Sequence, residues 1–132
     1  MNRQQTAELD AWIAEHVFKM KVLKTKTLVC FHDNEARNYD AIYDTREKYC
    51  GVWIWGAGDS IRYNPTHNPA LAIEVLKKCI DRHMVTLWKT KLSEHDQYVL
   101  ENKTSNNGNT LEADQDLCIA ICKYARQLNW YY

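Results

Sequence analysis

The chain has 132 residues, 45% of them hydrophobic and 26% charged, and its 17 Lys and Arg residues balance 17 Asp and Glu residues. This length and composition predict one soluble globular domain over residues 1–132. The formal net charge of zero removes the basic excess that non-specific binding to nucleic acid or to a membrane surface requires, so we expect neither partner. Copies of so neutral a protein repel one another little, and we therefore expect a homo-oligomer.

The cysteines and the N-terminal segment bear on the cellular compartment. There are five cysteines, an odd number, and they form no Cys-x-x-Cys pair. The first residues are polar and then amphipathic, without the apolar core of a secretory signal, and no run of apolar residues is long enough to span a membrane. Free thiols without a signal predict a protein of the reducing cytoplasm.

The first predicted element is an amphipathic helix over residues 6–20, "TAELDAWIAEHVFKM". Thr6 is the expected N-cap, and Glu8 and Asp10 would lie in the first turn, where the helix dipole favours acidic side chains. Its apolar positions recur with helical spacing and predict one buried stripe. They are Leu9, Trp12, Ile13 and Val17.

Residues 21–33, "KVLKTKTLVCFHD", contain β-branched residues and no helix cap, which predicts one or two strands. The following segment, residues 33–49, is mostly polar and rich in acids and tyrosines. Its pattern leaves three possibilities open, namely a loop, a short helix or a mobile flap.

A hairpin and a capped helix are predicted in the centre of the chain. Residues 52–55, "VWIW", favour a strand, Gly56–Asp59 a turn, and Ser60–Tyr63 a returning strand. Asn68 then caps a helix that has Pro69 in its first position. This helix is expected to run to about residue 83 and to bury one apolar face, made of Leu71, Ile73, Val75, Leu76, Cys79 and Ile80.

The C-terminal part repeats this order. Residues 85–102 predict two strands around a turn at Ser93–Asp96, and Asn106–Asn109 is a strong turn signal before a short strand at Thr110–Glu112. Asp114 is the expected cap of the last helix, "QDLCIAICKYARQL".

The predicted order is one helix, three strands, a second helix, three strands and a third helix. Helices must cover the apolar faces of a sheet, so we predict an α+β fold in which an antiparallel sheet and three helices form an α/β/α sandwich. The two later helices align without gaps, Asn68 opposite Asp114 and Lys77 opposite Lys123. This alignment predicts an internal ββα duplication, although any two capped amphipathic helices share such features.

Three helix segments carry a resemblance that spans nearly the whole chain: "ELDAWIAEHVF", "PALAIEVLKKC" and "ADQDLCIAICKYA". In order and spacing they are similar to the pattern of the phage ABA sandwich domain family, small proteins encoded by bacteriophages and prophages. The resemblance implies an α/β/α sandwich of phage origin that works in the cytoplasm of an infected bacterial host. It implies no reaction. Residues 33–49 have no counterpart in that pattern and are expected to be an insertion or a flap.

Candidate chemistry is sparse. Cys30, His32 and Asp33 are residue types that bind metals, but the closely spaced ligand pairs of a structural zinc site are absent, and Cys118 and Cys122 lie in an apolar helix stripe. No nucleophile elbow, P-loop or dinucleotide-binding glycine motif occurs. We therefore expect no metal, no cofactor, no catalytic residues and no enzyme activity.

Ligand binding is the sharper hypothesis. Trp53 and Trp55 share one face of their strand, because residues i and i+2 point the same way. Stacking rings, a guanidinium and a helix N-terminus are what a nucleotide site requires. The predicted ligand-binding residues are Trp53, Trp55, Arg62, Tyr63, His67 and Asn68. The alternative is that the strand face carrying the two tryptophans is simply core.

A protein interface is the other binding hypothesis. Tyrosines in the acidic segment and an aromatic C-terminus suit a contact surface. The predicted interface residues are Tyr39, Tyr43, Trp130, Tyr131 and Tyr132. The alternative is that the terminal aromatics dock on the chain's own sheet.

Together these features predict a non-enzymatic phage accessory protein that acts in counter-defence or host takeover. Its partner would be a host protein or a small host-derived ligand, such as a nucleotide immune signal. The alternatives are a small hydrolase and a purely structural accessory protein.

Overall fold

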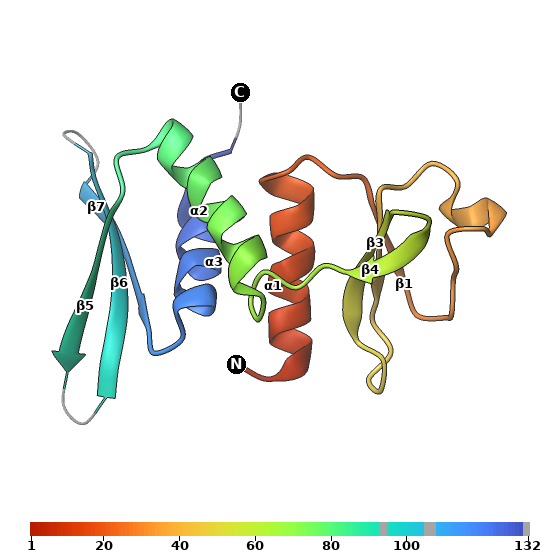
Figure 1. The fold of residues 1–132 in the computed structure, drawn as a ribbon, viewed down its shortest axis with the longest axis horizontal. Helices are drawn as coiled ribbons and strands as arrows, with labels where there is room; N and C mark the ends of the chain where they lie inside the picture. Colours follow the sequence, from red (N-terminus) through yellow and green to blue (C-terminus); the bar gives the residue numbers. More distant parts are fainter. Residues whose placement is uncertain (93–94, 105–107, 131–132) are drawn as a thin grey trace. The chain divides into compact units, whose positions relative to one another are not determined.

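The computed structural model of this chain describes residues 1–92, 95–104 and 108–130. Most of its elements are labelled in Figure 1. In chain order they are α1 (Arg3–His16), β1 (Val22–Thr25), the short 3₁₀ helix η1 (Asn34–Ala36), β2 (Ala41–Asp44), β3 (Gly51–Gly56), β4 (Asp59–Arg62), α2 (Pro69–Arg82), β5 (Thr86–Leu92), β6 (His95–Thr104), β7 (Gly108–Asp114) and α3 (Leu117–Gln127). The chain divides into two compact units, Met1–Asn64 and Pro65–Tyr132. The single domain predicted over residues 1–132 stays a prediction. Among the described residues, no helix has the length and apolar character needed to cross a membrane.

The first unit is built on a mixed four-stranded sheet in the order β1-β2-β3-β4. β1 and β2 run parallel, whereas β2 with β3 and β3 with β4 are antiparallel. Backbone hydrogen bonds fix both ends of the parallel pair, since Ala41 N–H donates to the Lys21 carbonyl and Thr45 N–H to the Thr25 carbonyl. The connection over residues 26–40 contains η1 and returns the chain to the end of the sheet at which β1 began.

Helix α1 packs on this sheet, chiefly on β3. Its predicted apolar stripe is confirmed, with Leu9 and Ile13 fully buried. The predicted cap at Thr6 is wrong, because the helix begins earlier and Asn2 caps it. Asn2 and Gln5 form a capping box, in which each side chain accepts a hydrogen bond from the other residue's backbone N–H. The first turn therefore holds no acidic residue.

The predicted hairpin is confirmed as β3 and β4. Ala57 and Gly58 connect the strands, and both have positive φ values, 52° and 79°. Two successive residues in the left-handed region are typical of the tight turn whose twist matches that of the flanking strands. The turn places β4 directly beside β3 at the edge of the sheet.

The second unit is built on a three-stranded antiparallel sheet in the order β5-β6-β7. α3 packs on β6 and β7, and α2 packs against α3. The ammonium of Lys123 on α3 lies 3.1 Å from a Glu112 oxygen and 3.2 Å from an Asp114 oxygen, which marks the face of β7 that α3 covers. Leu100 of β6, which pairs with Glu112 and so shares this face, is fully buried.

Helix α2 has the predicted N-cap but not the predicted buried face. The Asn68 side chain accepts a hydrogen bond from a first-turn backbone N–H at 3.0 Å. Val75 and Cys79 are fully buried, as expected. Ile73 and Ile80 are 43% and 56% exposed, so the buried stripe is narrower than the apolar pattern predicted.

The cap of α3 is shifted from its predicted place. Asp116, not Asp114, is the N-cap, and its carboxylate accepts a hydrogen bond from the Ile119 N–H at 3.2 Å. The gapless alignment placed Asn68 opposite Asp114. Since the actual caps are Asn68 and Asp116, that alignment does not superpose the starts of the two helices. The internal duplication stays a prediction, and its shared cap is no longer an argument for it.

The predicted α+β class is confirmed: within the described residues, α1 and α3 pack on sheets made largely of antiparallel strands, and α2 packs against α3. The prediction of one antiparallel sheet is wrong, because the strands form two sheets and β1 pairs with β2 in parallel. The segment 33–49 is only partly irregular, since it contains β2, an inner strand of the first sheet. Residues 93–94 and 106–107 of the two turns predicted in the C-terminal part lie outside the described residues, whereas His95 and Asp96 belong to β6 and Gly108 and Asn109 to β7.

Candidate functional site

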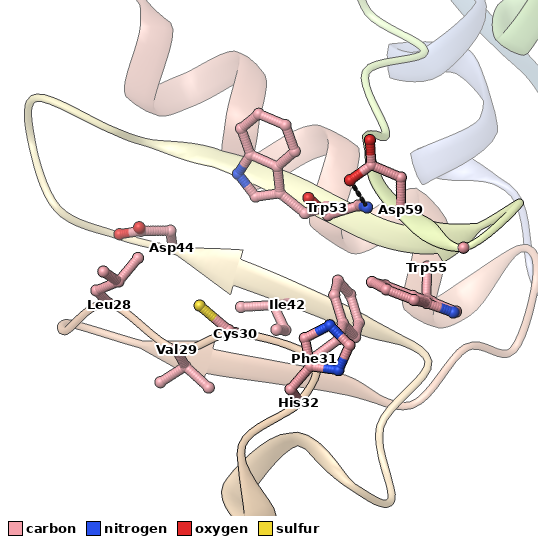
Figure 2. A pocket seen from close by; sticks show the side chains of 12 residues that line it. Leu28, Val29, Cys30, Phe31, His32, Ile42, Asp44, Trp53, Trp55 and Asp59 are labelled. Carbon is pink, nitrogen blue, oxygen red and sulfur yellow. Dashed lines mark hydrogen bonds between the residues drawn. The ribbon is translucent and has the colours of Figure 1, made fainter.

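One face of the first sheet carries a cavity of about 350 Å³. Side chains alternate across a strand, so Trp53 and Trp55 point to one face of β3 and Val52 to the other. The charge of Glu8 on α1 acts on Tyr43, the strand partner of Val52, so α1 covers the Val52 face. The cavity therefore lies on the face opposite α1, and Figure 2 shows the side chains that line it. It is lined by Leu28, Val29, Cys30, Phe31, His32, Ile42, Asp44, Trp53, Trp55, Gly58, Asp59 and Ser60.

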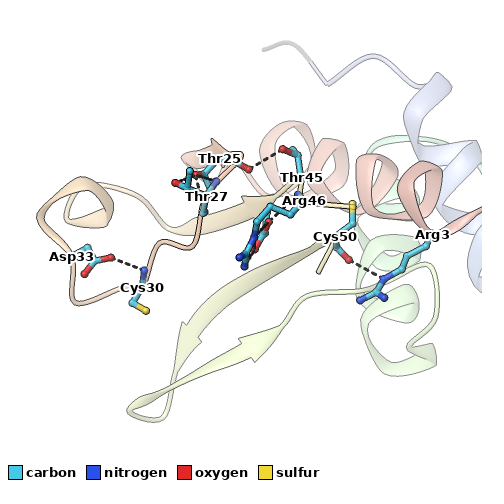
Figure 3. A network of polar contacts seen from close by, with 9 residues as sticks. Arg3, Thr25, Thr27, Cys30, Asp33, Thr45, Arg46 and Cys50 are labelled. Atoms are coloured by element: carbon cyan, nitrogen blue, oxygen red, sulfur yellow. Dashed lines mark hydrogen bonds and ion pairs between the residues drawn. The ribbon is translucent and has the colours of Figure 1, made fainter. Parts of the chain in front are cut away.

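A wall of the cavity comes from residues 28–32 of the connection between β1 and β2. Local hydrogen bonds at Thr25 and at Asp33, on either side of residues 28–32, stabilise this part of the connection (Figure 3). The Thr25 hydroxyl accepts a hydrogen bond from the Thr27 N–H at 3.1 Å, and an Asp33 carboxylate oxygen accepts one from the Cys30 N–H at 2.9 Å. Polar side chains of this kind stabilise turns by replacing backbone partners. They hold the apolar residues of the connection over the sheet.

Aromatic rings dominate one end of the cavity. The Trp55 ring centroid lies 5.8 Å from that of Phe31, with 51° between the ring planes, and 5.1 Å from that of His32, with 79° between the planes. Neither ring stacks flat on the indole, and Trp55 stays 44% exposed. Trp53 is half-buried beside it on the same strand face. A ligand that enters the cavity can therefore contact indole surface that the chain itself leaves open.

The polar groups of the cavity are mainly acidic. Asp44 is buried and accepts hydrogen bonds through both carboxylate oxygens from the Arg46 guanidinium, the shortest at 2.7 Å. Burial alone would raise the pKa of Asp44, but the hydrogen bonds and charge of Arg46 lower it below its ordinary value, so the carboxyl stays ionised and paired. Asp59 is exposed and accepts a hydrogen bond from the Ser60 N–H at 2.8 Å. Among the described residues that line the cavity there is no Lys or Arg.

The predicted ligand-binding residues of the first unit separate into two groups. Trp53 and Trp55 line the cavity, whereas Arg62 and Tyr63 are not among its described lining residues. The Arg62 guanidinium lies over Gly51, where a Cβ atom would come within 3.6 Å of it. Tyr63 is buried in the unit and donates its N–H to the backbone of β3. The alternative that the tryptophan face is filled core does not describe Trp55, which is exposed.

The other two predicted ligand-binding residues, His67 and Asn68, belong to the second unit. Asn68 is the N-cap of α2, and a His67 ring nitrogen lies 3.0 Å from the Thr66 hydroxyl. Both side chains thus have structural contacts of their own. A nucleotide site made of all six residues stays a prediction.

The predicted interface residues differ in their surroundings. Tyr39 and Tyr43 are half-buried, and each has a lysine ammonium over its ring. Trp130 is only 3% exposed, and its indole N–H donates to a backbone carbonyl of α3 at 2.7 Å. This ring therefore docks on helix α3, and the alternative that the terminal aromatics dock on the chain's own sheet stays a prediction. Tyr131 and Tyr132 lie outside the described residues.

Sequence reasoning missed the contribution of the β1–β2 connection. Cys30 and His32 were considered only as metal ligands, and Phe31 was not considered. Across residues 1–92, 95–104 and 108–130, no three His, Cys, Asp or Glu side chains gather to hold a metal ion. These residues instead line the cavity with Trp55. The alternating Trp53 and Trp55 were the one signal that pointed to this place.

No known protein family, curated protein or solved structure matches this chain. The resemblance to the phage ABA sandwich domain family therefore stays a prediction, carried by the three helix segments alone.

Proposed function

We propose that this protein is a non-enzymatic binding protein that holds a small ligand in the cavity of its first unit. The observation that carries the proposal is the pair of tryptophans on the sheet face opposite α1, where Trp53 and Trp55 line a cavity of about 350 Å³. A volume of this size, and a lining that combines apolar and aromatic side chains with polar groups, are typical of small-molecule sites. The second wall, residues 28–32, comes from the connection between β1 and β2.

The biological setting of the proposal rests on the helix resemblance. The protein would be a phage accessory protein in the cytoplasm of an infected bacterium, and the ligand would come from the host. Sequestering such a ligand in counter-defence or host takeover needs binding and no turnover. A small hydrolase and a purely structural protein are the competing functions.

Native mass spectrometry after incubation with a small-molecule extract of bacterial cells tests the proposal. We expect the wild-type protein to retain a compound that is released unchanged in mass after denaturation. The double variant Trp53→Ala/Trp55→Ala should lose it while keeping its circular dichroism spectrum. The control is Trp88→Ala, which removes an exposed strand tryptophan from the second unit and should leave retention intact.

Each result has a defined meaning. Retention by the wild type and loss in the double variant support the proposal. A released compound whose mass changes with incubation time would favour the hydrolase instead. An empty wild-type protein, or equal retention by the double variant, would overturn ligand binding at this cavity.

A protein partner is the second candidate, in the form of a second copy of the chain. Trp88 and Leu111 are 37% and 51% exposed. In the strand register both lie on the face of the second sheet opposite the one that carries Glu112 and α3. Exposed apolar residues that share one sheet face favour a contact surface. The same native spectra read the oligomeric state, and Trp88→Ala should shift an oligomer towards monomer, whereas an unchanged state would exclude this face.

A further inference from the structure

The charged side chains around the cavity indicate which class of ligand it can bind. Its described lining contains two carboxylates, Asp44 and Asp59, and no cationic side chain. The Asp44 charge is balanced by Arg46, which holds it at 2.7 Å. Asp59 makes no ion pair with any described Lys or Arg, so its charge is uncompensated at the cavity. The described lining itself is thus acidic, and a cation outside it, the Arg62 guanidinium, lies over Gly51 on the sheet face that carries Trp53.

A phosphate group finds no partner in this lining. Of the two arginines nearest in sequence to the lining strands, Arg46 is held by Asp44, and the Arg62 guanidinium lies over Gly51, outside the described lining. Phosphate recognition relies on Arg, Lys or a cluster of backbone N–H groups. Two described backbone N–H groups bind the lining carboxylates, and both are already used: that of Ser60 donates to Asp59, and that of Arg46 donates to Asp44.

The aromatic rings favour the opposite charge. The face of an indole carries the negative part of the ring quadrupole and attracts cations, most strongly when the cation is removed from water. Trp53 and Trp55 bring two indoles to one small cavity, and Phe31 adds a phenyl ring. Phe31 and His32 meet Trp55 at an inclination rather than in a stack, and Trp55 stays 44% exposed.

From these contacts we propose that the cavity binds a compact organic cation of the alkylated ammonium class, with the tryptophan rings around its head and Asp59 as its counter-charge. This inference rests on the proposed function, because it names the ligand class of the same site. It differs from the nucleotide expected from the sequence, since a nucleotide would place phosphate among carboxylates.

The test uses two matched pairs of probes in isothermal titration calorimetry with the whole protein. Choline and 3,3-dimethyl-1-butanol have nearly the same shape, but only choline is charged. Adenosine and adenosine monophosphate share a base, but only the second carries phosphate. We expect choline to bind about tenfold or more tightly than its neutral isostere, and adenosine monophosphate to bind no better than adenosine.

Single substitutions test which side chains of the cavity bind choline. Asp59→Asn removes the charge but keeps an oxygen that can accept from Ser60 N–H, and should weaken choline binding about fivefold while leaving the neutral isostere unchanged. Trp55→Leu should weaken choline binding further, about tenfold. The control Glu35→Gln removes an exposed carboxylate of the same unit that does not line the cavity and should have no effect.

The outcomes distinguish the two proposals. Equal affinity for choline and its isostere, or an effect of Glu35→Gln as large as that of Asp59→Asn, would overturn the cation inference and leave ligand binding standing. Tighter binding of adenosine monophosphate than of adenosine would overturn it in favour of a nucleotide. Absence of choline binding at millimolar concentration would also overturn it, while the cell-extract experiment would decide separately whether the cavity binds any ligand.

Discussion

The hydroxyl of Tyr124 shows how a single buried group can cost stability. The side chain is fully buried, and within the described part of the chain its hydroxyl has no hydrogen-bond partner. Burial raises its pKa to about 12, with a smaller contribution from Cys79. The group therefore stays neutral, but it has lost its hydrogen bonds to water.

Replacing this residue by phenylalanine should stabilise the protein. We expect Tyr124→Phe to raise the free energy of unfolding by about 1 kcal/mol, because it removes an unsatisfied buried hydroxyl and keeps the ring. Urea denaturation measures the difference, and Tyr98→Phe, at a half-buried ring, serves as the control. A clear loss of stability in Tyr124→Phe would show that the hydroxyl has a partner that matters.

His83 links the stability of the second unit to pH. Its pKa is lowered from the ordinary value of 6.5, mainly by burial and then by the charge of Arg82. The unfolded chain therefore binds the proton more readily than the folded one. The contribution of His83 is fully present above pH 6.5 and is lost as the pH falls through the lower pKa of the folded state.

The pH dependence of stability tests this assignment. Between pH 7.5 and 5.5, we expect wild-type stability in urea to fall more than that of His83→Gln, which has no titrating ring. The difference between the two proteins isolates His83 from the carboxylates that titrate in both. Parallel pH profiles would contradict the assignment.

The five cysteines should differ in their rates of reaction with a thiol reagent, because they differ in exposure. Cys30 is exposed and lines the cavity, whereas Cys50, Cys79 and Cys122 are buried and Cys118 is half-buried. Burial raises the pKa of Cys79 to about 12, which leaves little thiolate to react. We expect one fast-reacting thiol with Ellman's reagent in the native protein, removed by Cys30→Ser and slowed by a bound ligand. Two or more fast thiols would contradict the structure.

At the scale of elements, the caps decide where helices begin. The Asp116 side chain accepts a hydrogen bond from Ile119 N–H at the start of α3. Asp116→Ala should lower the free energy of unfolding by about 1 kcal/mol, whereas Asp116→Asn keeps an acceptor and should cost much less. Thermal or urea unfolding of the two variants compares them directly. Equal stability of the two would place the cap elsewhere.

Local signals in the sequence were sufficient for several elements. Asn68 before Pro69 identifies the start of α2, and Ala57-Gly58 between alternating apolar residues identifies the β3–β4 turn. At the start of α3, two possible capping residues lie close together, and the prediction of Asp114 instead of Asp116 was wrong. The capping box at the start of α1 was readable in Asn2 and Gln5 but was overlooked.

Long-range pairing was not readable in the same way. The parallel pairing of β1 with β2 depends on the path of residues 26–40, and no local pattern specifies it. The position of the cavity depends both on a local sequence pattern and on long-range strand pairing. The alternation of Trp53 and Trp55 predicted one wall, whereas the place of residues 28–32 follows from the strand pairing and could not be predicted.

At the scale of the whole molecule, the proposed ligand site and the proposed self-association surface lie in different compact units. The cavity and all its described lining residues belong to Met1–Asn64, while the exposed Trp88 and Leu111 belong to Pro65–Tyr132. Ligand binding and self-association are therefore proposed for different units. Variants in one unit can serve as controls for the other.

The central claim is that the tryptophans of β3 bind a ligand, and the indole N–H signals in a ¹H–¹⁵N correlation spectrum test it most directly. The chain has five tryptophans, and single substitutions assign their five signals. On titration with choline, or with the compound released from the cell-extract experiment, the signals of Trp53 and Trp55 should shift while those of Trp88 and Trp130 stay in place. A bound ligand that leaves both β3 signals unchanged would contradict the account.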